Sequence, residues 1–298
     1  MNGFVRPCQP AELPFVIESI DREFIFSKGR SISLSGRFPN VLSDHNIEHV
    51  LVAEADHAIC GAAGIRTFVY ATEQRLWRGA MLGMVWVDPQ YRGHGIGREL
   101  MTAAERLLRA EGLDFGVLWT GIPAFYERRG WLLNDISAFS EIRGSSPVLH
   151  KGEVHCRPLA SEDAGRLESV RSSLEARRVL RGALDYQVIP VPAVAVHCFW
   201  ATANEGDGYA LVGEADGVGF FYEMIAPPVL WDLLWSAITG RFKRIFINGR
   251  SEDPFAIWLA EEKNVKWECQ DKTMWLPISR FSADAPLNTW HIPYFDRI

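Results

Sequence analysis

The alternation of apolar and polar positions in the first half of the chain predicts three consecutive strands followed by a helix. Two apolar runs within residues 48–71 are separated by the polar residues 54–57, which is typical of a hairpin. A third run covers residues 76–87 and is closed by Asp88-Pro89. After a glycine-rich stretch, helical spacing predicts a helix that ends at Gly112 and carries on one face Leu100, Ala104, Leu107 and Leu108.

The other predicted elements of the first half flank this group. Residues 4–9 predict a strand and residues 11–24 a helix, both before the hairpin. Residues 113–120 predict a short buried strand, and residues 122–130 a short helix with proline near its start and glycine at its end. The expected order is strand, helices, three antiparallel strands, glycine loop, helix, strand, helix and final strands.

The second half repeats this order. The segment "HCRPLASEDAGRLESVRS" echoes "FVRPCQPAELPFVIESID" about 151 residues later, with Arg157-Pro158 in the place of Arg6-Pro7. Strands are predicted at 195–203, 208–216, 217–228 and 244–249, helices at 229–241 and 254–263, and a last strand pair at 265–278. The glycine-rich stretch is missing, because "APP" at residues 226–228 leads directly into the predicted helix without glycines.

We therefore expect two tandem domains of one layered α/β (α+β) fold, each with a mostly antiparallel mixed sheet flanked by helices. The first domain is predicted at residues 1–144 and a degenerate second domain at residues 153–280. Residues 143–153 form the predicted linker, and residues 281–298 a C-terminal tail.

Composition favours a soluble, cytoplasmic protein. With 298 residues, 48% of them hydrophobic, the chain is long enough for two cored domains. The five cysteines are scattered without a CxxC pair, which argues against a disulfide framework or a zinc site. No apolar run has transmembrane length and no signal peptide is recognisable. A net charge of −6 disfavours nucleic acid and mildly favours a cationic small molecule.

The stretch "YRGHGIGREL" at residues 91–100 places three glycines and two arginines where a helix begins. The first N–H groups of a helix have no intrahelical partner, and glycines let an anion approach the backbone closely, so a phosphate cradle is one interpretation. A solvated glycine-rich turn is the other. A dinucleotide fingerprint has different spacing and follows the first strand of a parallel unit, and a Walker A motif needs Gly-Lys-Ser/Thr.

Together, "VWVDPQYRGHGIGRELM" and "GVLWTGIPAFYERRGW" resemble motifs A and B of the GNAT superfamily of acyl-CoA-dependent N-acetyltransferases. The loop signature Q/R-x-x-G-x-G/A of that family is matched by Arg92, Gly95 and Gly97. The resemblance covers about residues 3–143. The layout is similar to that of tandem-domain members such as mycothiol synthases and enhanced-intracellular-survival-type acetyltransferases.

The resemblance implies a binding site for acetyl-CoA as co-substrate, without a metal. A bulge near Val87 would separate its strand from the next, pantetheine would add along that edge, and the Val87 N–H would polarise the thioester carbonyl. Residues 93–98 would hold the pyrophosphate. The implied cofactor-binding residues are Val85, Trp86, Val87, Arg92, Gly93, His94, Gly95, Ile96, Gly97, Arg98, Gly121 and Ile122.

The resemblance also makes Tyr126 the candidate catalytic residue, a general acid that protonates the leaving thiolate; the alternative is a core aromatic. The strand before the loop lacks the glutamate that acts as base in many family members, so no base is assigned. Asp88 is expected to form a turn rather than act as base. Glu23, Asp44, His45 and Glu48 are further candidates, each expected to be solvated rather than catalytic. The C-terminal carboxylate of Ile298 is another candidate.

We expect an N-acetyltransferase that moves acetyl to a primary amine of a small cationic acceptor by direct attack in a ternary complex. The alternatives are a non-catalytic acyl-CoA-binding sensor or partner module and a protein N-acetyltransferase. The sequence indicates neither a nucleic-acid nor a membrane partner, and it leaves a homo-oligomer open.

Overall fold

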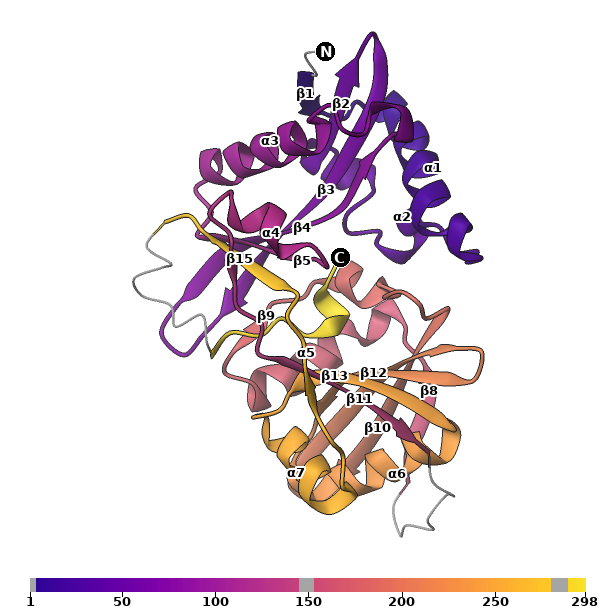
Figure 1. The fold of residues 1–298 in the computed structure, drawn as a ribbon. Helices are drawn as coiled ribbons and strands as arrows, with labels where there is room; N and C mark the ends of the chain where they lie inside the picture. Colours follow the sequence, from indigo (N-terminus) through magenta and orange to yellow (C-terminus); the bar gives the residue numbers. More distant parts are fainter. Residues whose placement is uncertain (1–3, 145–152, 280–288) are drawn as a thin grey trace. The chain divides into compact units, whose positions relative to one another are not determined.

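The computed structural model describes residues 4–144, 153–279 and 289–298, and the chain divides into two compact units. The first unit comprises residues 1–134, 272–287 and 298, and the second comprises residues 135–271 and 288–297. Each unit is built on one mixed sheet flanked by helices (Figure 1). Most of the predicted linker, and residues 281–288 of the predicted tail, lie outside the described residues.

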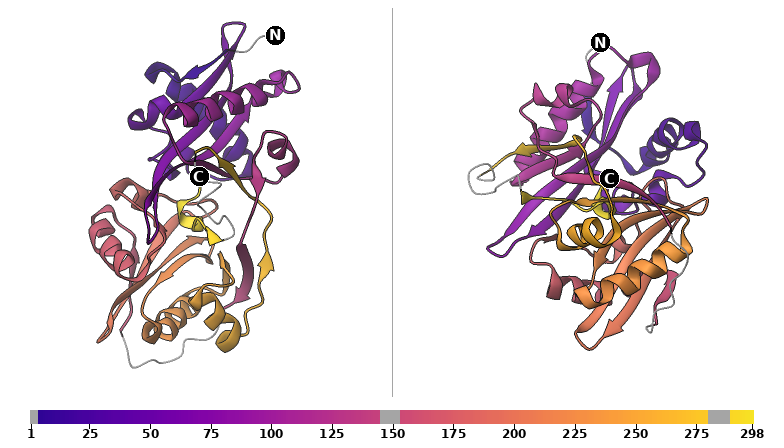
Figure 2. Two further views of the ribbon diagram at one scale, coloured as in Figure 1. Left: turned by 90° about the vertical axis from the view of Figure 1, so that its left-hand side faces the viewer. Right: turned by 60° about the horizontal axis from the view of Figure 1, so that its bottom comes forward.

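The first sheet has the strand order β1-β2-β3-β4-β5-β15-β6. Its strands are β1 (Phe4–Pro7), β2 (Val50–Ala55), β3 (Ala58–Ala71), β4 (Leu76–Val87), β5 (Phe115–Trp119), β15 (Thr273–Pro277) and β6 (Leu132–Leu133). Its helices are α1 (Leu13–Phe24), α2 (Leu34–Arg37), α3 (Ile96–Ala110) and α4 (Pro123–Glu127). Helices α1 and α3 cover opposite faces of this sheet (Figures 1 and 2).

The second sheet has the order β14-β7-β13-β12-β11-β10-β8. Its strands are β14 (Glu268–Cys269), β7 (Ser137–Arg143), β13 (Arg244–Arg250), β12 (Val218–Ile225), β11 (Gly206–Ala215), β10 (Ala195–Ala203) and β8 (His155–Pro158). The short strand β9 (Arg178–Val179) lies between α5 and β10 in the chain. The helices of this unit are α5 (Ala164–Leu174), α6 (Trp231–Arg241) and α7 (Pro254–Lys263).

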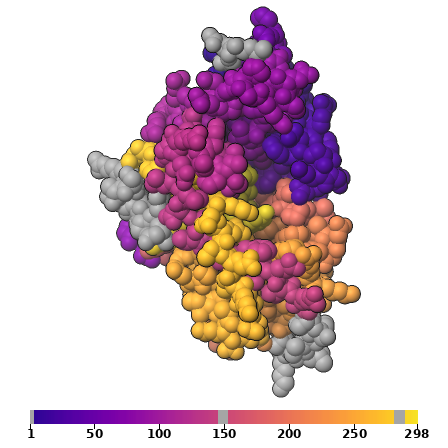
Figure 3. All heavy atoms as spheres, in the orientation of Figure 1, coloured from indigo at the N-terminus to yellow at the C-terminus, as the bar shows by residue number. Residues whose placement is uncertain are grey.

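Two strands belong to a different sheet from the one that chain order suggests. Strand β7 pairs with β13 and β14 in the second sheet, where magenta atoms of this part of the chain lie among orange ones (Figure 3). Strand β15 pairs with β5 and β6 in the first sheet. The predicted division at residue 144 is therefore wrong for these strands, and the predicted pair at 265–278 is split between the two sheets.

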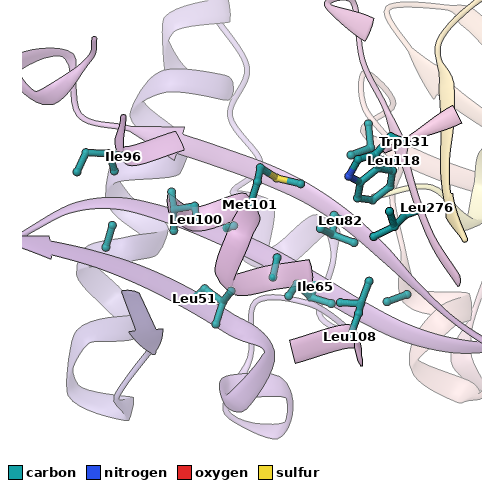
Figure 4. Close-up of a cluster of buried hydrophobic side chains, with 14 of the residues drawn as sticks. Leu51, Ile65, Leu82, Ile96, Leu100, Met101, Leu108, Leu118, Trp131 and Leu276 are labelled. Carbon is teal, nitrogen blue, oxygen red and sulfur yellow. The ribbon is translucent and has the colours of Figure 1, made fainter. Parts of the chain in front are cut away.

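The core of the first unit explains why the segment after the glycines is helical. Ile96, Leu100, Met101 and Leu108 of α3 point toward apolar side chains of the sheet (Figure 4). All four are at most 2% exposed, so they supply the continuous apolar face that stabilises an amphipathic helix. Burying each such side chain contributes about 1.5–3 kcal/mol, which fixes the start of α3, and with it the glycine loop, on the sheet.

The Arg-Pro segment of each unit forms an ion pair of the same kind. In the first, both terminal guanidinium nitrogens of Arg6 donate to Glu12 (2.7 Å each), which also accepts the N–H of Gln9 (2.9 Å). In the second, Arg157 pairs with Asp163, which accepts the N–H of Ala160 (3.1 Å). The repeated Arg-Pro therefore marks the same strand-to-helix connection twice.

The second unit contains a buried ion network. Arg181 donates through two nitrogens to Glu223 of β12 (2.8 and 2.7 Å) and through two to Asp296 (both 2.8 Å). Tyr209 adds a hydrogen bond to Glu223 (3.0 Å). The side chains of Arg181, Glu223 and Asp296 are 0%, 6% and 1% exposed, so these charges depend on one another for solvation.

All five cysteines are free thiols, as their scattered spacing predicts. In the parts of the chain that the structure describes, no helix combines the length and the apolar character needed to cross a membrane.

Candidate active site

The glycine loop forms a left-handed backbone turn that leads directly into α3. Gly93 has φ 83° and Gly95, the N-cap of α3, has φ 86°. Only glycine adopts this region at low cost, which explains two of the three glycines. A side chain added at either position would meet no atom within 4 Å, so the loop backbone faces open space. The N–H groups of the first helical turn are thus accessible to an anion.

The basic residues of the loop differ in their contacts. Arg92 pairs with Glu23 of α1 (3.0 Å), and its Nε donates to the carbonyl oxygen of Val87 (3.1 Å). His94 Nδ1 lies 3.1 Å from the carbonyl oxygen of Arg92. Arg98 is exposed in the first turn of α3. Arg92 therefore joins the loop to α1 and to the end of β4, whereas Arg98 adds positive charge at the helix start.

Strand β4 carries a bulge just before the loop. Its register against β3 shifts between Trp86, opposite Ala62, and Gly83, opposite Gly64. Within the shift Met84 has φ 55°, an unusual conformation for a residue with a long side chain. The structure thus contains the bulge that the resemblance implies.

Pairing between β4 and β5 ends early. The two strands are parallel partners from Gly79 and Phe115 to Met81 and Val117, so the later part of β4 keeps only β3 as a partner among the described strands. The N–H of Asp88 donates to β3 (2.9 Å). Because successive peptide groups point to alternate sides of a strand, the N–H of Val87 points to the free edge.

The other implied cofactor residues lie around this edge. Val85 and Val87 are half-buried against the core of the first unit, and Trp86 is buried. Ile96 is buried and anchors α3, so its contribution to an anion site is its backbone N–H. Gly121 and Ile122 follow β5 and are exposed, with Ile122 64% exposed. These positions, the loop and Tyr126 all belong to the first unit.

Tyr126 lies on α4 with its ring half-buried. The ring packs against the core and makes edge contacts with Phe125 and Trp131, at centroid distances of 4.9 and 6.1 Å. Burial raises the pKa of Tyr126 above its ordinary value, partly offset by a hydrogen bond from the Thr120 side chain. The phenol therefore stays protonated at neutral pH, as a general acid must. The core-aromatic and acid interpretations are compatible.

A polar cluster that the sequence did not reveal fixes α4 to α3. Arg129 makes two hydrogen bonds to Glu105 (2.8 Å each) and one to Thr102 (3.0 Å). Glu105 also accepts the indole N–H of Trp131 (3.0 Å). The side chains of Arg129 and Glu105 are 14% and 15% exposed, so the cluster holds the segment after Tyr126 firmly. The partners are 24 and 26 residues apart, beyond any local pattern.

The candidates for the general base lie in different surroundings. The side chain of Asp88 accepts the N–H of Gln90 (2.8 Å) and caps a turn, which confirms the turn interpretation. Asp44, His45 and Glu48 are exposed. The backbone of Ile298 lies against the β4 bulge, because a side chain added at Gly83 would stand 2.9 Å from its carbonyl oxygen.

Comparison with known proteins shows which family this arrangement resembles. Residues 46–131, from the end of the segment before β2 to Trp131, match the family model described as acetyltransferase (GNAT) domain. The chain contains a GNAT domain. The match includes the bulge, the glycine loop and Tyr126. Across the described residues, no group of three or more His, Cys, Asp or Glu side chains is arranged to hold a metal ion.

A curated relative supports the GNAT assignment over a short segment. An "Uncharacterized N-acetyltransferase ycf52-like" protein of Prochlorococcus marinus is 39% identical over 51 residues. This covers 16% of the chain and only 28% of the relative.

Solved structures resemble the whole chain in fold. A GCN5-related N-acetyltransferase from Anabaena variabilis has a TM-score of 0.74 at 12% identity, covering 95% of this chain and 74% of that one. One from Kribbella flavida gives 0.67 at 16% identity, covering 92% and 70%. Eis1 from Mycobacterium abscessus gives 0.67 at 14% identity, covering 94% and 75%. At these identities the likeness concerns the fold alone.

The second unit differs from the GNAT domain at the position of the loop. After β12, Pro227 and Pro228 lead through a short 3-10 turn (Pro228–Leu230) into α6. Prolines have no backbone N–H, and no glycine lies between β12 and α6. On α7, Ile257 occupies the position that corresponds to Tyr126 and is 43% exposed. Both features that mark the first site are replaced.

Proposed function

We propose that the chain is an N-acetyltransferase that uses acetyl-CoA to acetylate a primary amine of a small cationic acceptor. The observation that carries the proposal is the combination of the open glycine loop, the free edge of β4 after its bulge, and Tyr126, all in one unit. The loop would hold the pyrophosphate, and pantetheine would add along β4 as an extra strand does. Acetyl-CoA supplies the activated acetyl group.

The chain's own residues have three tasks in this reaction. The N–H of Val87 stabilises negative charge on the thioester oxygen as the amine nitrogen attacks the carbonyl carbon. The new C–N bond forms and the C–S bond breaks. Tyr126 donates its proton to the leaving thiolate and regains one from solvent. The proton that the amine loses leaves through a base or water, and we assign no residue to that step.

A thiol-release assay with acetyl-CoA and a panel of aminoglycosides, polyamines, amino acids and peptides tests the proposal. We expect acceptor-dependent thiol release, highest with small polycationic amines, because the chain is acidic overall. Tight acetyl-CoA binding without turnover by any amine would instead identify an acyl-CoA sensor. Turnover restricted to peptides would identify a protein acetyltransferase.

Titration calorimetry tests the loop directly. We expect one CoA equivalent per chain, because the second unit replaces the loop with prolines. Gly95→Val should abolish most of this binding, since a β-branched side chain is strained at positive φ and lies where the phosphates approach. Two equivalents in the wild-type protein would contradict the assignment of one site.

The matched control is Gly112→Val. Gly112 ends α3 at φ 65° and also has open space around it, so the substitution causes comparable backbone strain away from the loop. Its CoA affinity should stay near that of the wild type. If Gly95→Val retained normal affinity while remaining folded, the phosphate-cradle interpretation would be wrong.

A further inference from the structure

The two units place different side chains beside the repeated arginine. In the first unit, β1 and β2 pair Phe4 with Glu54. In the second, β8 and β10 pair His155 with Trp200 at the corresponding position. The second unit therefore has histidine for phenylalanine and tryptophan for glutamate on the strand pair that carries its Arg-Pro.

This replacement changes the charge balance of the arginine. Arg6 lies between two carboxylates, Glu12 at 2.7 Å and Glu54 at 2.9 Å, and its side chain is 21% exposed. Arg157 keeps only the equivalent of Glu12, which is Asp163, and its side chain is 54% exposed. The second carboxylate is lost, so the guanidinium of Arg157 is less fully neutralised than that of Arg6.

A cavity of about 390 Å³ opens at this position, within the usual size range of small-molecule sites. His155, Arg157 and Arg166 contribute basic groups to its lining, and Asp163 is its acidic lining residue. The guanidinium of Arg166 lies 3.4 Å above the centre of the Trp200 ring, which fixes its plane. The structure thus holds two arginines at one cavity.

Most hydrogen-bond donors of these arginines are unused. A guanidinium carries five N–H donors in a planar fork. Within the described residues, Arg157 donates to Asp163 through one nitrogen, and Arg166 to Asp207 through one nitrogen at 3.5 Å. Planar forks with free donors match the oxygens of a phosphate or a carboxylate.

We propose that the second unit binds a small molecule through an oxyanion, a phosphate or a carboxylate, held by Arg157 and Arg166 in this cavity. The Cys198 thiol also lines it, but burial raises its pKa to about 12, so it remains an unreactive thiol. This proposal does not rest on the acetyl-CoA site proposed in the first unit.

Titration calorimetry at constant ionic strength, with inorganic phosphate and separately with malonate, tests this site. Gly95→Val serves as the background, so that the glycine loop does not contribute. We expect saturable binding of one of the two anions. Arg166→Gln should weaken it about tenfold or more, because charge-assisted hydrogen bonds are lost while the Arg157–Asp163 pair stays intact.

Arg22→Gln is the control, since Arg22 is an exposed arginine of α1 paired with Glu18, and its loss should leave anion affinity unchanged. A preference for phosphate or for malonate shows whether the ligand's oxyanion is a phosphate or a carboxylate, and both outcomes support the site. Absence of saturable binding, or equal affinity in folded Arg166→Gln, would overturn it. The anion titration does not measure acetyl-CoA turnover, which the thiol-release assay tests, so the two proposals can fail separately.

Discussion

Tyr126→Phe should lower kcat by about 10²–10⁴-fold while acetyl-CoA affinity changes little. The substitution removes the hydroxyl that would protonate the thiolate. It keeps the ring, whose contacts with Phe125 and Trp131 hold it on α4. Steady-state kinetics with the best amine, together with calorimetric titration of CoA, measure the two quantities separately.

Tyr91→Phe provides the control, because Tyr91 packs against the same core and the substitution removes only its hydroxyl. The pH profile adds a second criterion. Burial raises the pKa of Tyr126, so the acid form persists above the ordinary phenol value, and Tyr126 should cause no loss of kcat below about pH 10. Near-normal turnover by the Phe variant would leave Tyr126 a core aromatic and assign the protonation to water.

Arg181→Met should destabilise the second unit by about 3–5 kcal/mol. The substitution leaves Glu223 and Asp296 as buried carboxylates without their cation. Urea unfolding measures the loss of stability. Hydrogen exchange of the β12 amides tests whether the loss occurs in the second unit. Replacing all three charges together, with Glu223→Gln and Asp296→Asn added, should recover part of the stability because no unpaired charge remains.

The control is Arg241→Met in the same unit. Arg241 pairs with Glu214 at 3.0 Å, but its side chain is 41% exposed, so its loss should cost about 0–1 kcal/mol. Equal effects of the two substitutions would show that burial does not strengthen the Arg181 network.

The Arg181 network also has a predictable pH dependence. Burial by itself raises the pKa of Glu223, but the charge and hydrogen bonds of Arg181 outweigh it and hold the pKa below the ordinary value. A carboxyl with a lowered folded-state pKa stabilises the fold above its unfolded pKa of about 4.3 and loses this contribution as pH falls. The stability difference between wild type and Arg181→Met should therefore shrink in acid.

The sequence predicted individual elements well because each depends on local pattern. Strand β10 begins and ends at the predicted residues 195–203, and β5 and α4 lie within their predicted ranges. The sheet to which β7 and β15 belong could not be predicted. A strand pattern shows which face is apolar, but it does not show which neighbour supplies the hydrogen bonds.

For the candidate site, the sequence predicted the features that follow from the glycine spacing and from the resemblance to the family. The left-handed turns at Gly93 and Gly95 follow from the residue type. The positive φ of Met84 does not, because methionine rarely adopts it and it occurs at a shift of the β3–β4 register. The Arg129–Glu105 pair was also missed, since it joins the segment after α4 to α3 through the tertiary fold rather than through adjacent positions.

The placement of β15 in the first sheet has a consequence for synthesis of the chain. Strand β5 is complete at Trp119, but its partner spans Thr273–Pro277 and emerges from the ribosome more than a hundred residues later. Until then the first sheet has an open edge that can pair with other nascent chains. Pairing of such distant segments is slow, because the entropy of loop closure must be overcome first. The GNAT domain therefore reaches its native sheet only after translation has passed through nearly all of the second unit.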